Sequence, residues 1–200
     1  MAGAIWGTFW DGPWDGAVRT ALLRKLSRED RARFAAFPSG GGRPAERGRQ
    51  FLLSRALLAF ALEETLGGRE PPILAKDAGG RPFLPERPGL FLSLSHTEGA
   101  VLVGLSRRDI GVDIQRIRPA SPGLMKRFGA FSEAAFFESW VRREARAKRT
   151  GTPVELGAES PLAPEERLWF PETIPGCAAC VAFEGRLRRE VRRLCLEELL

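Results

Sequence analysis

The chain has 200 residues, of which 44% are hydrophobic and 28% are charged, with a formal net charge of +6, a composition typical of a globular protein with one substantial core or two small ones. No apolar run approaches the ~20 residues of a membrane span, so we expect no membrane partner. The apolar start, Met1 to Trp10, follows no basic stretch and ends at Asp11, so we expect a cytoplasmic protein without a signal peptide.

The first seventy residues predict two helices. A helix over Leu26 to Phe37 opens at Ser27 with acidic residues in its first turn, and the glycine-rich stretch Ser39 to Pro44 breaks it. A longer apolar helix runs from Ala45 to Leu66 and stops at Gly67-Gly68, where glycine is the usual terminator. Its composition is that of a core helix.

The middle of the chain favours short strands. Asp77-Ala78-Gly79-Gly80 is typical of a turn between two short strands within Ile73 to Leu84. Three further strands are predicted, at Leu90 to Leu94, Ala100 to Leu105 and Ile110 to Ile114.

The last third begins with a proline-rich connection from Pro119 to Ser132. A helix from Ser132 to Thr150 follows and ends at Gly151, and the Pro/Gly-rich loop from Thr152 to Pro164 is disorder-prone. The remaining chain predicts strands near Leu168 to Phe170 and Ala178 to Phe183, and finally a basic helix.

The two main helices resemble each other weakly. FLLSR at Phe51 to Arg55 and FFESW at Phe136 to Trp140 fall at like positions in helices that each end in glycine, with short strands around both. This pattern suggests two similar α+β halves, residues 1–106 and 107–200.

Arginine supplies 27 of the 31 basic residues. The arginines form two clusters, one at Arg142, Arg143, Arg146 and Arg149, the other at Arg186, Arg188, Arg189, Arg192 and Arg193. Guanidinium groups suit phosphates and carboxylates, so a phosphate-bearing ligand or an acidic partner is one interpretation and a solvated helix face is the other.

The cysteines do not indicate a metal site. Cys177, Cys180 and Cys195 are odd in number, and the CxxC that the first two form has neither a second CxxC nor a histidine nearby. We therefore expect buried structural thiols.

Several polar residues fall where a site needs them. Along the strand after residue 110, Asp113 and Gln115 share one face with Gly111, because side chains alternate. On the last long helix, Glu144 and Lys148 are neighbours one turn apart, which is also the spacing of an ordinary helix ion pair. With the only histidine, His96, in a turn, these groups make a magnesium and phosphate site plausible, whereas a lone histidine there is commonly structural.

Four motifs stand in a fixed order: Gly80-Arg81-Pro82, Leu94-Ser95-His96, Gly111-Val112-Asp113-Ile114, and Trp140 to Lys148 with Glu144-Ala145 inside. From about Leu26 to Gly151 the chain resembles the 4'-phosphopantetheinyl transferases, in their longer single-chain type. The resemblance implies an α+β fold of two pseudo-symmetric halves, each a small antiparallel sheet on a long helix, with the active site in the cleft between them. It also implies transfer of the phosphopantetheine arm of coenzyme A to a serine of an acyl or peptidyl carrier protein, with release of 3',5'-ADP.

The resemblance also implies residue roles. Asp113 and Glu144 would hold Mg²⁺, with Gln115 as a further ligand, through a water. Glu144 or a metal-bound water would be the base, and Lys148 would offset phosphate charge. The coenzyme A phosphates would be bound by Arg49, Arg81, Ser95, His96 and Lys148. The carrier would be acidic, docking on a basic surface that includes Met125 to Phe128, and the protein a monomer without a nucleic-acid partner.

Three features depart from the family pattern. Gln115 stands where an acidic residue is common, Arg143 replaces the lysine of Lys-Glu-Ala, and the link from Pro119 to Ser132 is short. Mg²⁺ needs only one or two protein carboxylates beside substrate phosphates, so Asp113 with Glu144 can suffice. The alternatives are a degenerate non-catalytic relative and a basic nucleic-acid-binding protein; a Ser95–His96 hydrolase is disfavoured because neighbours on an extended chain point to opposite sides.

Overall fold

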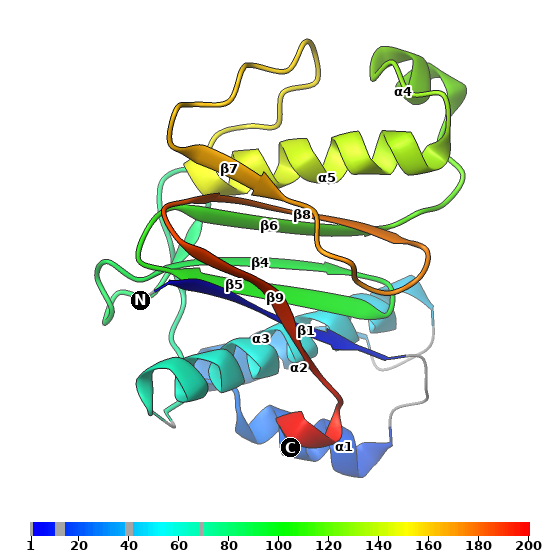
Figure 1. Ribbon diagram of the computed structural model, residues 1–200. Helices are drawn as coiled ribbons and strands as arrows, with labels where there is room; N and C mark the ends of the chain where they lie inside the picture. The colour runs from blue at the N-terminus through cyan, green and yellow to red at the C-terminus, as the bar shows by residue number, and fades with distance from the viewer. Residues whose placement is uncertain (1, 11–14, 39–41, 69) are drawn as a thin grey trace.

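Two β-sheets lie face to face between two layers of helices in the computed structural model, which describes residues 2–10, 15–38, 42–68 and 70–200 (Figure 1). The first sheet has the order β4-β5-β1-β9. Its strands are β1 (Gly3–Phe9), β4 (Phe91–Thr97), β5 (Ala100–Ser106) and β9 (Leu187–Leu194). All neighbours are antiparallel except β1 and β9, which are parallel.

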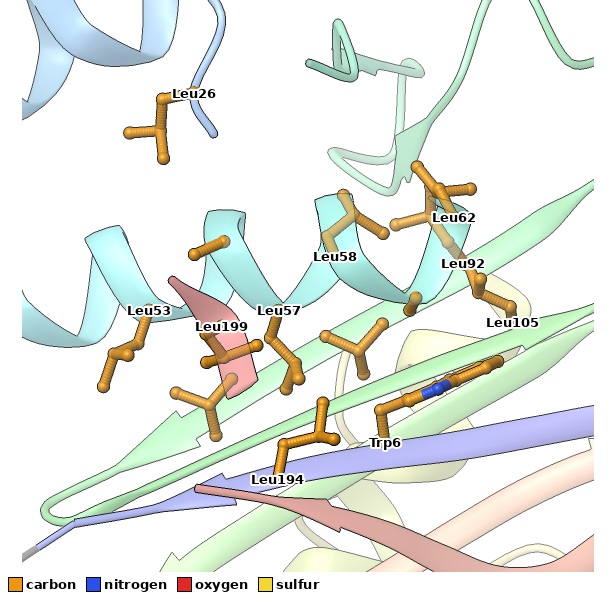
Figure 2. Packing of buried hydrophobic residues seen from close by; sticks show 14 of the residues in the cluster. Trp6, Leu26, Leu53, Leu57, Leu58, Leu62, Leu92, Leu105, Leu194 and Leu199 are labelled. Atoms are coloured by element: carbon orange, nitrogen blue, oxygen red, sulfur yellow. The ribbon is translucent and has the colours of Figure 1, made fainter. Parts of the chain in front are cut away.

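Three helices cover the outer face of this sheet. They are α1 (Gly16–Arg24), α2 (Arg28–Ala35) and the long α3 (Arg43–Leu66). Figure 2 shows leucines of α3 packed against the sheet residues Trp6, Leu92, Leu105 and Leu194, and against Leu199 of the short helix η1 (Glu197–Leu199). This apolar cluster anchors both the start and the end of the chain to the same helix.

The second sheet is smaller and has the order β6-β8-β7. Its strands are β6 (Ile110–Arg116), β7 (Glu166–Trp169) and β8 (Cys177–Glu184). The long helix α5 (Glu133–Thr150) packs on its outer face through Val141 and Ala145, and the short α4 (Pro122–Arg127) precedes it. The inner face packs on the first sheet, where Ile110, Val112 and Ile114 meet Ile5 and Leu102.

Hydroxyl side chains join the two sheets along β4 and β6. These strands belong to different sheets, and alternate residues of β4 accept hydrogen bonds from alternate backbone N–H groups of β6: Ser93 from Val112 at 3.0 Å, Ser95 from Ile114 at 3.2 Å and Thr97 from Arg116 at 3.1 Å. The free edge of β6 is thereby satisfied by side chains in place of a neighbouring strand.

The short pair β2 (Ala75–Lys76) and β3 (Pro82–Phe83) brackets the predicted turn. Oδ1 of Asp77 accepts from the N–H groups of Gly79 and Arg81, and Gly80 has a φ of 82°, which favours glycine. This turn brings Arg81 toward the site.

Most predicted elements are confirmed, within a few residues at their ends, but the final basic helix is wrong. That segment is β9, because Leu187 and Val191 pack on the core between the sheets and the free edge of β1 offers a pairing partner. Arginine tolerates a helix well, so local propensity misleads where distant pairing decides. Helices α1 and α4 were not predicted. Of the predicted breaker Ser39 to Pro44, residues 39–41 lie outside the described part.

The mixed α+β class is confirmed, and each sheet packs on one long helix. The expectation of two antiparallel sheets is wrong for the first sheet, since β9 joins it in parallel after leaving β8. The division of the chain into halves between residues 106 and 107 remains a prediction. β9 comes from the second of these halves but belongs to the sheet of the first. In the residues that the structure describes, no helix is long and apolar enough to span a bilayer; the cytoplasmic location stays a prediction.

Candidate active site

Helix α5 lies unusually close to β6 because Gly111 has no side chain. A Cβ built at residue 111 would lie 2.5 Å from the backbone N of Arg149 and closer still to the carbonyl oxygen of Ala145. Both atoms belong to helix backbone, which cannot rotate away. The close approach sets Glu144 and Lys148 of α5 over the face of β6 that carries Asp113.

Asp113 is the centre of a buried polar cluster. Its side chain is 1% exposed, and its Oδ1 accepts from Nζ of Lys148 and from Oγ of Ser95, each at 2.6 Å. Its Oδ2 accepts from Nε2 of Gln115 at 3.3 Å. Oγ of Ser95 accepts in turn from Lys148 at 3.1 Å and from the N–H of Ile114. Each oxygen of the buried carboxylate therefore has at least one donor, as a buried charge requires, and Oδ2 keeps room for a further partner.

Glu144 is the second carboxylate of the cluster. Burial raises its pKa, and repulsion from Asp113 raises it further, while Lys148 acts in the opposite direction. In the part of the chain that the structure describes, no ion pair or hydrogen bond engages the Glu144 carboxylate. It is consequently available to a ligand or a proton.

A pocket of about 310 Å³ opens beside Glu144 and Lys148. Its walls come from the turn before β3, from β4, from α5 and from the loop after it: Gly79 to Pro82, Leu92 to Leu94, Ala147, and Gly151 to Val154. Arg81 reaches this pocket with its Nη2 2.6 Å from Oδ1 of Asp109 and its guanidinium 5.1 Å above the ring of Phe91. A second cation, Arg81, thus lines the pocket together with Glu144 and Lys148.

His96 lies beyond Ser95 on β4, with its ring exposed to solvent. The surrounding protein removes part of the water around the ring and so lowers the pKa of His96; the charge of Lys148 lowers it further, against the opposing effect of Asp113. The imidazole is therefore neutral at pH 7, so it can donate a hydrogen bond without carrying a charge.

The structure brings most of the predicted site residues together. Ser95, Asp113, Gln115 and Lys148 form one hydrogen-bonded cluster, and Glu144 and Arg81 border the adjoining pocket. Two predicted residues stay outside this arrangement in the described part of the chain. His96 lies in β4 and not in the predicted turn, and it neither hydrogen-bonds to the cluster nor lines the pocket. Arg49 pairs with Glu46 on α3, Nη2 to Oε2 at 2.8 Å, without a contact to the cluster. The helix ion pair of Glu144 with Lys148, which the spacing offered as the alternative, is not formed, and Lys148 pairs with Asp113.

The first arginine cluster has a structural use. Arg143 donates to the carbonyls of Glu155 and Gly157, and its guanidinium lies 4.5 Å above the ring of Phe128. The other three pair with carboxylates beyond the helix: Arg142 and Arg146 with Glu159, Arg146 and Arg149 with Glu166, and Arg149 with Glu184. Neither a solvated face nor a phosphate site describes this network, which ties the loop 152–164, expected to be disorder-prone, to α5.

The structure also shows the arrangement of possible metal ligands and of the three thiols. In residues 2–10, 15–38, 42–68 and 70–200, no group of three or more His, Cys, Asp or Glu is arranged to hold a metal. Cys180 is buried, Cys177 half-buried, and burial raises the pKa of both thiols. Cys195 is exposed, so the expectation of buried thiols is wrong there, because it follows the last residue of β9.

Sequence reasoning missed Ser93 and Thr97 of the seam between the sheets, the row of β4 hydroxyl groups that accept from the backbone of β6. It also missed Asp109, the partner of Arg81. The seam had a visible signal, since hydroxyls recur every second residue through Ser93, Ser95 and Thr97. Asp109 had none, because its pairing with Arg81 depends on the turn geometry.

Comparison with curated proteins gives relatives that all have the same name. No protein-family model matches the chain. It is 26% identical to the 4'-phosphopantetheinyl transferase Sfp of Bacillus subtilis (strain 168) over 160 residues, which are 68% of this chain and 70% of the relative. It is also 26% identical to the 4'-phosphopantetheinyl transferase ffp of Bacillus subtilis, and 21% identical to another transferase of that name from the same species, in both cases over 78% of this chain and 74% of the relative.

These relatives are enzymes of the transferase class, and the alternative of a non-catalytic or nucleic-acid-binding protein is not favoured. Within that class the chain is similar to the Sfp-like 4'-phosphopantetheinyl transferases, the resemblance that the four ordered motifs predicted.

Proposed function

We propose that this protein transfers the 4'-phosphopantetheine arm of coenzyme A to a serine hydroxyl of an apo acyl or peptidyl carrier protein and releases 3',5'-ADP. The observation that carries the proposal is the buried cluster of Asp113, Lys148 and Ser95 beside the unengaged carboxylate of Glu144. These residues lie on the motifs by which the sequence resembles the family of its relatives.

The residues present fit a magnesium ion. Burial raises the pKa of Glu144, and repulsion between its carboxylate and that of Asp113 raises it further. Two carboxylates that repel each other are oxygen ligands that suit a hard cation. Asp113 and Glu144 would hold Mg²⁺, and the amide of Gln115 would contribute through a water. When bound, Mg²⁺ supplies positive charge to the pyrophosphate of coenzyme A.

Glu144 takes the serine proton in this proposal. The serine Oγ forms a bond to the phosphorus that carries the pantetheine arm, and the bond from that phosphorus to the bridging oxygen of 3',5'-ADP breaks. The serine proton passes to the Glu144 carboxylate, and the leaving phosphate takes the electron pair. A base whose pKa is raised toward neutral pH is well matched to this task.

The phosphates of coenzyme A would be bound by cations and donors on both sides of the pocket. Lys148 and Arg81 border the pocket itself, and the neutral His96 would donate an N–H. Ser95 would serve chiefly by orienting Asp113 and Lys148. Arg49 pairs with Glu46 and would have to leave this pair to bind coenzyme A. We therefore assign it to the end of the nucleotide that lies farther from the Asp113 cluster.

The carrier protein would dock over α4 and the residues after it. Lys126 and Arg127 are exposed there, and so are the apolar side chains of Leu124, 44% exposed, and Phe131, 99% exposed. A basic surface with exposed apolar side chains complements an acidic helix. In this proposal the two α+β halves, residues 1–106 and 107–200, form the cleft, and the protein acts as a monomer.

The test is transfer itself. Purified protein, coenzyme A and Mg²⁺ are incubated with several apo carrier proteins, and the intact mass of each carrier is measured. We expect a gain of one phosphopantetheine arm, loss of the gain in Glu144→Gln, and no loss in Glu138→Gln, an exposed glutamate of the same helix. Absence of any mass gain, with Mn²⁺ also tried, would refute the proposal.

A further inference from the structure

The second arginine cluster lies outside the site described above. Four of its five arginines, Arg188, Arg189, Arg192 and Arg193, lie in β9, whose eight residues include only one acidic residue, Glu190; Arg186 directly precedes the strand. None of these residues borders the pocket beside Glu144. The cluster therefore needs its own explanation.

β9 is an edge strand. The sheet order β4-β5-β1-β9 leaves β9 paired on one side only, with β1, and no other segment that the structure describes pairs with it. In Figure 1 it crosses the front of the view beside β1. Backbone N–H and C=O groups on its outer side are thus available to another chain.

The side chains make this edge positive. Arg192 forms an ion pair with Glu64 of α3, Nε to Oε1 at 3.1 Å, and Arg193 donates hydrogen bonds to the backbone carbonyls of Glu172 and Thr173. Arg188 has no ion pair or hydrogen bond with any described residue. All four arginines are exposed, so the charge faces solvent.

A hollow of about 770 Å³ lies beside this edge, the most spacious of the cavities described here. Small or flat side chains line it, those of Ala2 just before β1 and of Ala4 and Trp6 in β1. Charged residues of both signs border it, namely Glu64 near the end of α3 and Arg188, Glu190 and Arg192 of β9. It offers room for side chains that project from a strand added next to β9.

We propose that the outer edge of β9 binds an extended acidic segment of a partner protein as an added β-strand. Backbone hydrogen bonds would provide the pairing, and the arginines would select glutamate or aspartate side chains. A second copy of this chain fits poorly, because pairing β9 with itself would set arginines opposite arginines. A nucleic acid would satisfy the charge but not the row of backbone donors and acceptors.

The experiment uses the full chain and a short fluorescein-labelled peptide of alternating glutamate and valine, followed by fluorescence anisotropy. A second peptide has the same sequence with alternate backbone nitrogens methylated, which keeps the charge and removes the donors that strand pairing needs. A single-stranded oligonucleotide is the third probe. The variant is Arg188→Glu with Arg189→Glu, and the charge-matched control is Arg24→Glu with Arg107→Glu, two exposed arginines elsewhere.

We expect saturable binding of the first peptide, at least about tenfold weaker binding in the β9 variant, and little change in the control variant. Equal binding of the methylated peptide would overturn strand addition, since charge alone would then explain the affinity. Absence of peptide binding, or equal loss in both variants, would overturn the proposal, and binding of the oligonucleotide alone would identify a nucleic-acid surface in its place. Unfolding curves and the transfer assay show whether each variant is folded.

Discussion

Replacing Gly111 by alanine tests whether the close contact of α5 with β6 positions the site. The new Cβ would stand 2.5 Å from the backbone N of Arg149, whereas real Cβ atoms essentially never come within 3.0 Å, and it would be nearer still to the carbonyl oxygen of Ala145. Because both neighbours are helix backbone, α5 must move away as a unit, by a distance on the order of 1 Å. Glu144 and Lys148 move with it.

The expected magnitudes follow from that displacement. Overpacking of this kind destabilises a protein by about 1–3 kcal/mol, and a misplacement of about 1 Å at reacting groups can reduce turnover about 100-fold. Urea unfolding measures the first effect, and the initial rate of carrier modification, read by intact mass, measures the second.

Gly104→Ala is the matched control. Its Cβ would also be crowded, 2.9 Å from Cγ1 of Val112 and 3.1 Å from Cδ1 of Ile110, but both are side-chain atoms that can turn aside. We expect a stability loss in the same range with turnover largely kept. If Gly111→Ala retained both the parent's turnover and its stability, the argument that glycine sets the helix position would be refuted.

Three further predictions concern the cluster. Ser95→Ala is expected to destabilise the protein by about 1–3 kcal/mol in urea unfolding and to slow transfer more than Ser93→Ala does, because only Ser95 also contacts Asp113; equal effects on transfer would contradict this. The folded-state pKa of Glu144 is raised, so the folded protein binds more protons than the unfolded chain between the two pKa values and stability falls as pH rises through that window. In EDTA, the Tm of Glu144→Gln relative to that of the parent should therefore increase as the pH rises above the ordinary glutamate pKa, about 4.3, and a difference independent of pH would count against it. Gln115→Glu adds a carboxylate beside Asp113 and should lower the half-activating Mg²⁺ concentration by about threefold or more in the transfer assay, and an unchanged titration would show that residue 115 does not reach the ion.

Local rules predicted the elements whose ends are set by local chemistry. α5 begins after Ser132, whose hydroxyl accepts from the N–H of Ala135, and ends at Gly151 with a φ of 73°. The alternation along β6 likewise placed Ile110 and Ile114 in the core and Asp113 on the opposite face. In each case the deciding contacts lie within a few residues along the chain.

Contacts between residues far apart in the chain determine the features that could not be predicted from local sequence patterns. β9 became a strand because β1 had a free edge some 180 residues earlier in the chain, and no local pattern in its arginines records that neighbour. The pairing within the site is similar. Helix spacing offered Glu144 as one partner for Lys148, but Lys148 reaches Asp113 across the α5–β6 contact, a pair that depends on how close Gly111 lets the helix come.

This exchange of partners has a chemical consequence. A helix ion pair would have neutralised Glu144 and left Asp113 buried without a cation, whereas the observed pairing gives the lysine to the more deeply buried carboxylate. Glu144 then keeps its oxygens free and its pKa raised, which are the two properties that a base or a metal ligand needs. Ser95 stabilises the same arrangement because its single hydroxyl contacts Asp113, Lys148 and the backbone of β6 together. The seam between the sheets and the proposed active site are therefore one structure, and a change in how β4 meets β6 should alter the chemistry as well as the stability.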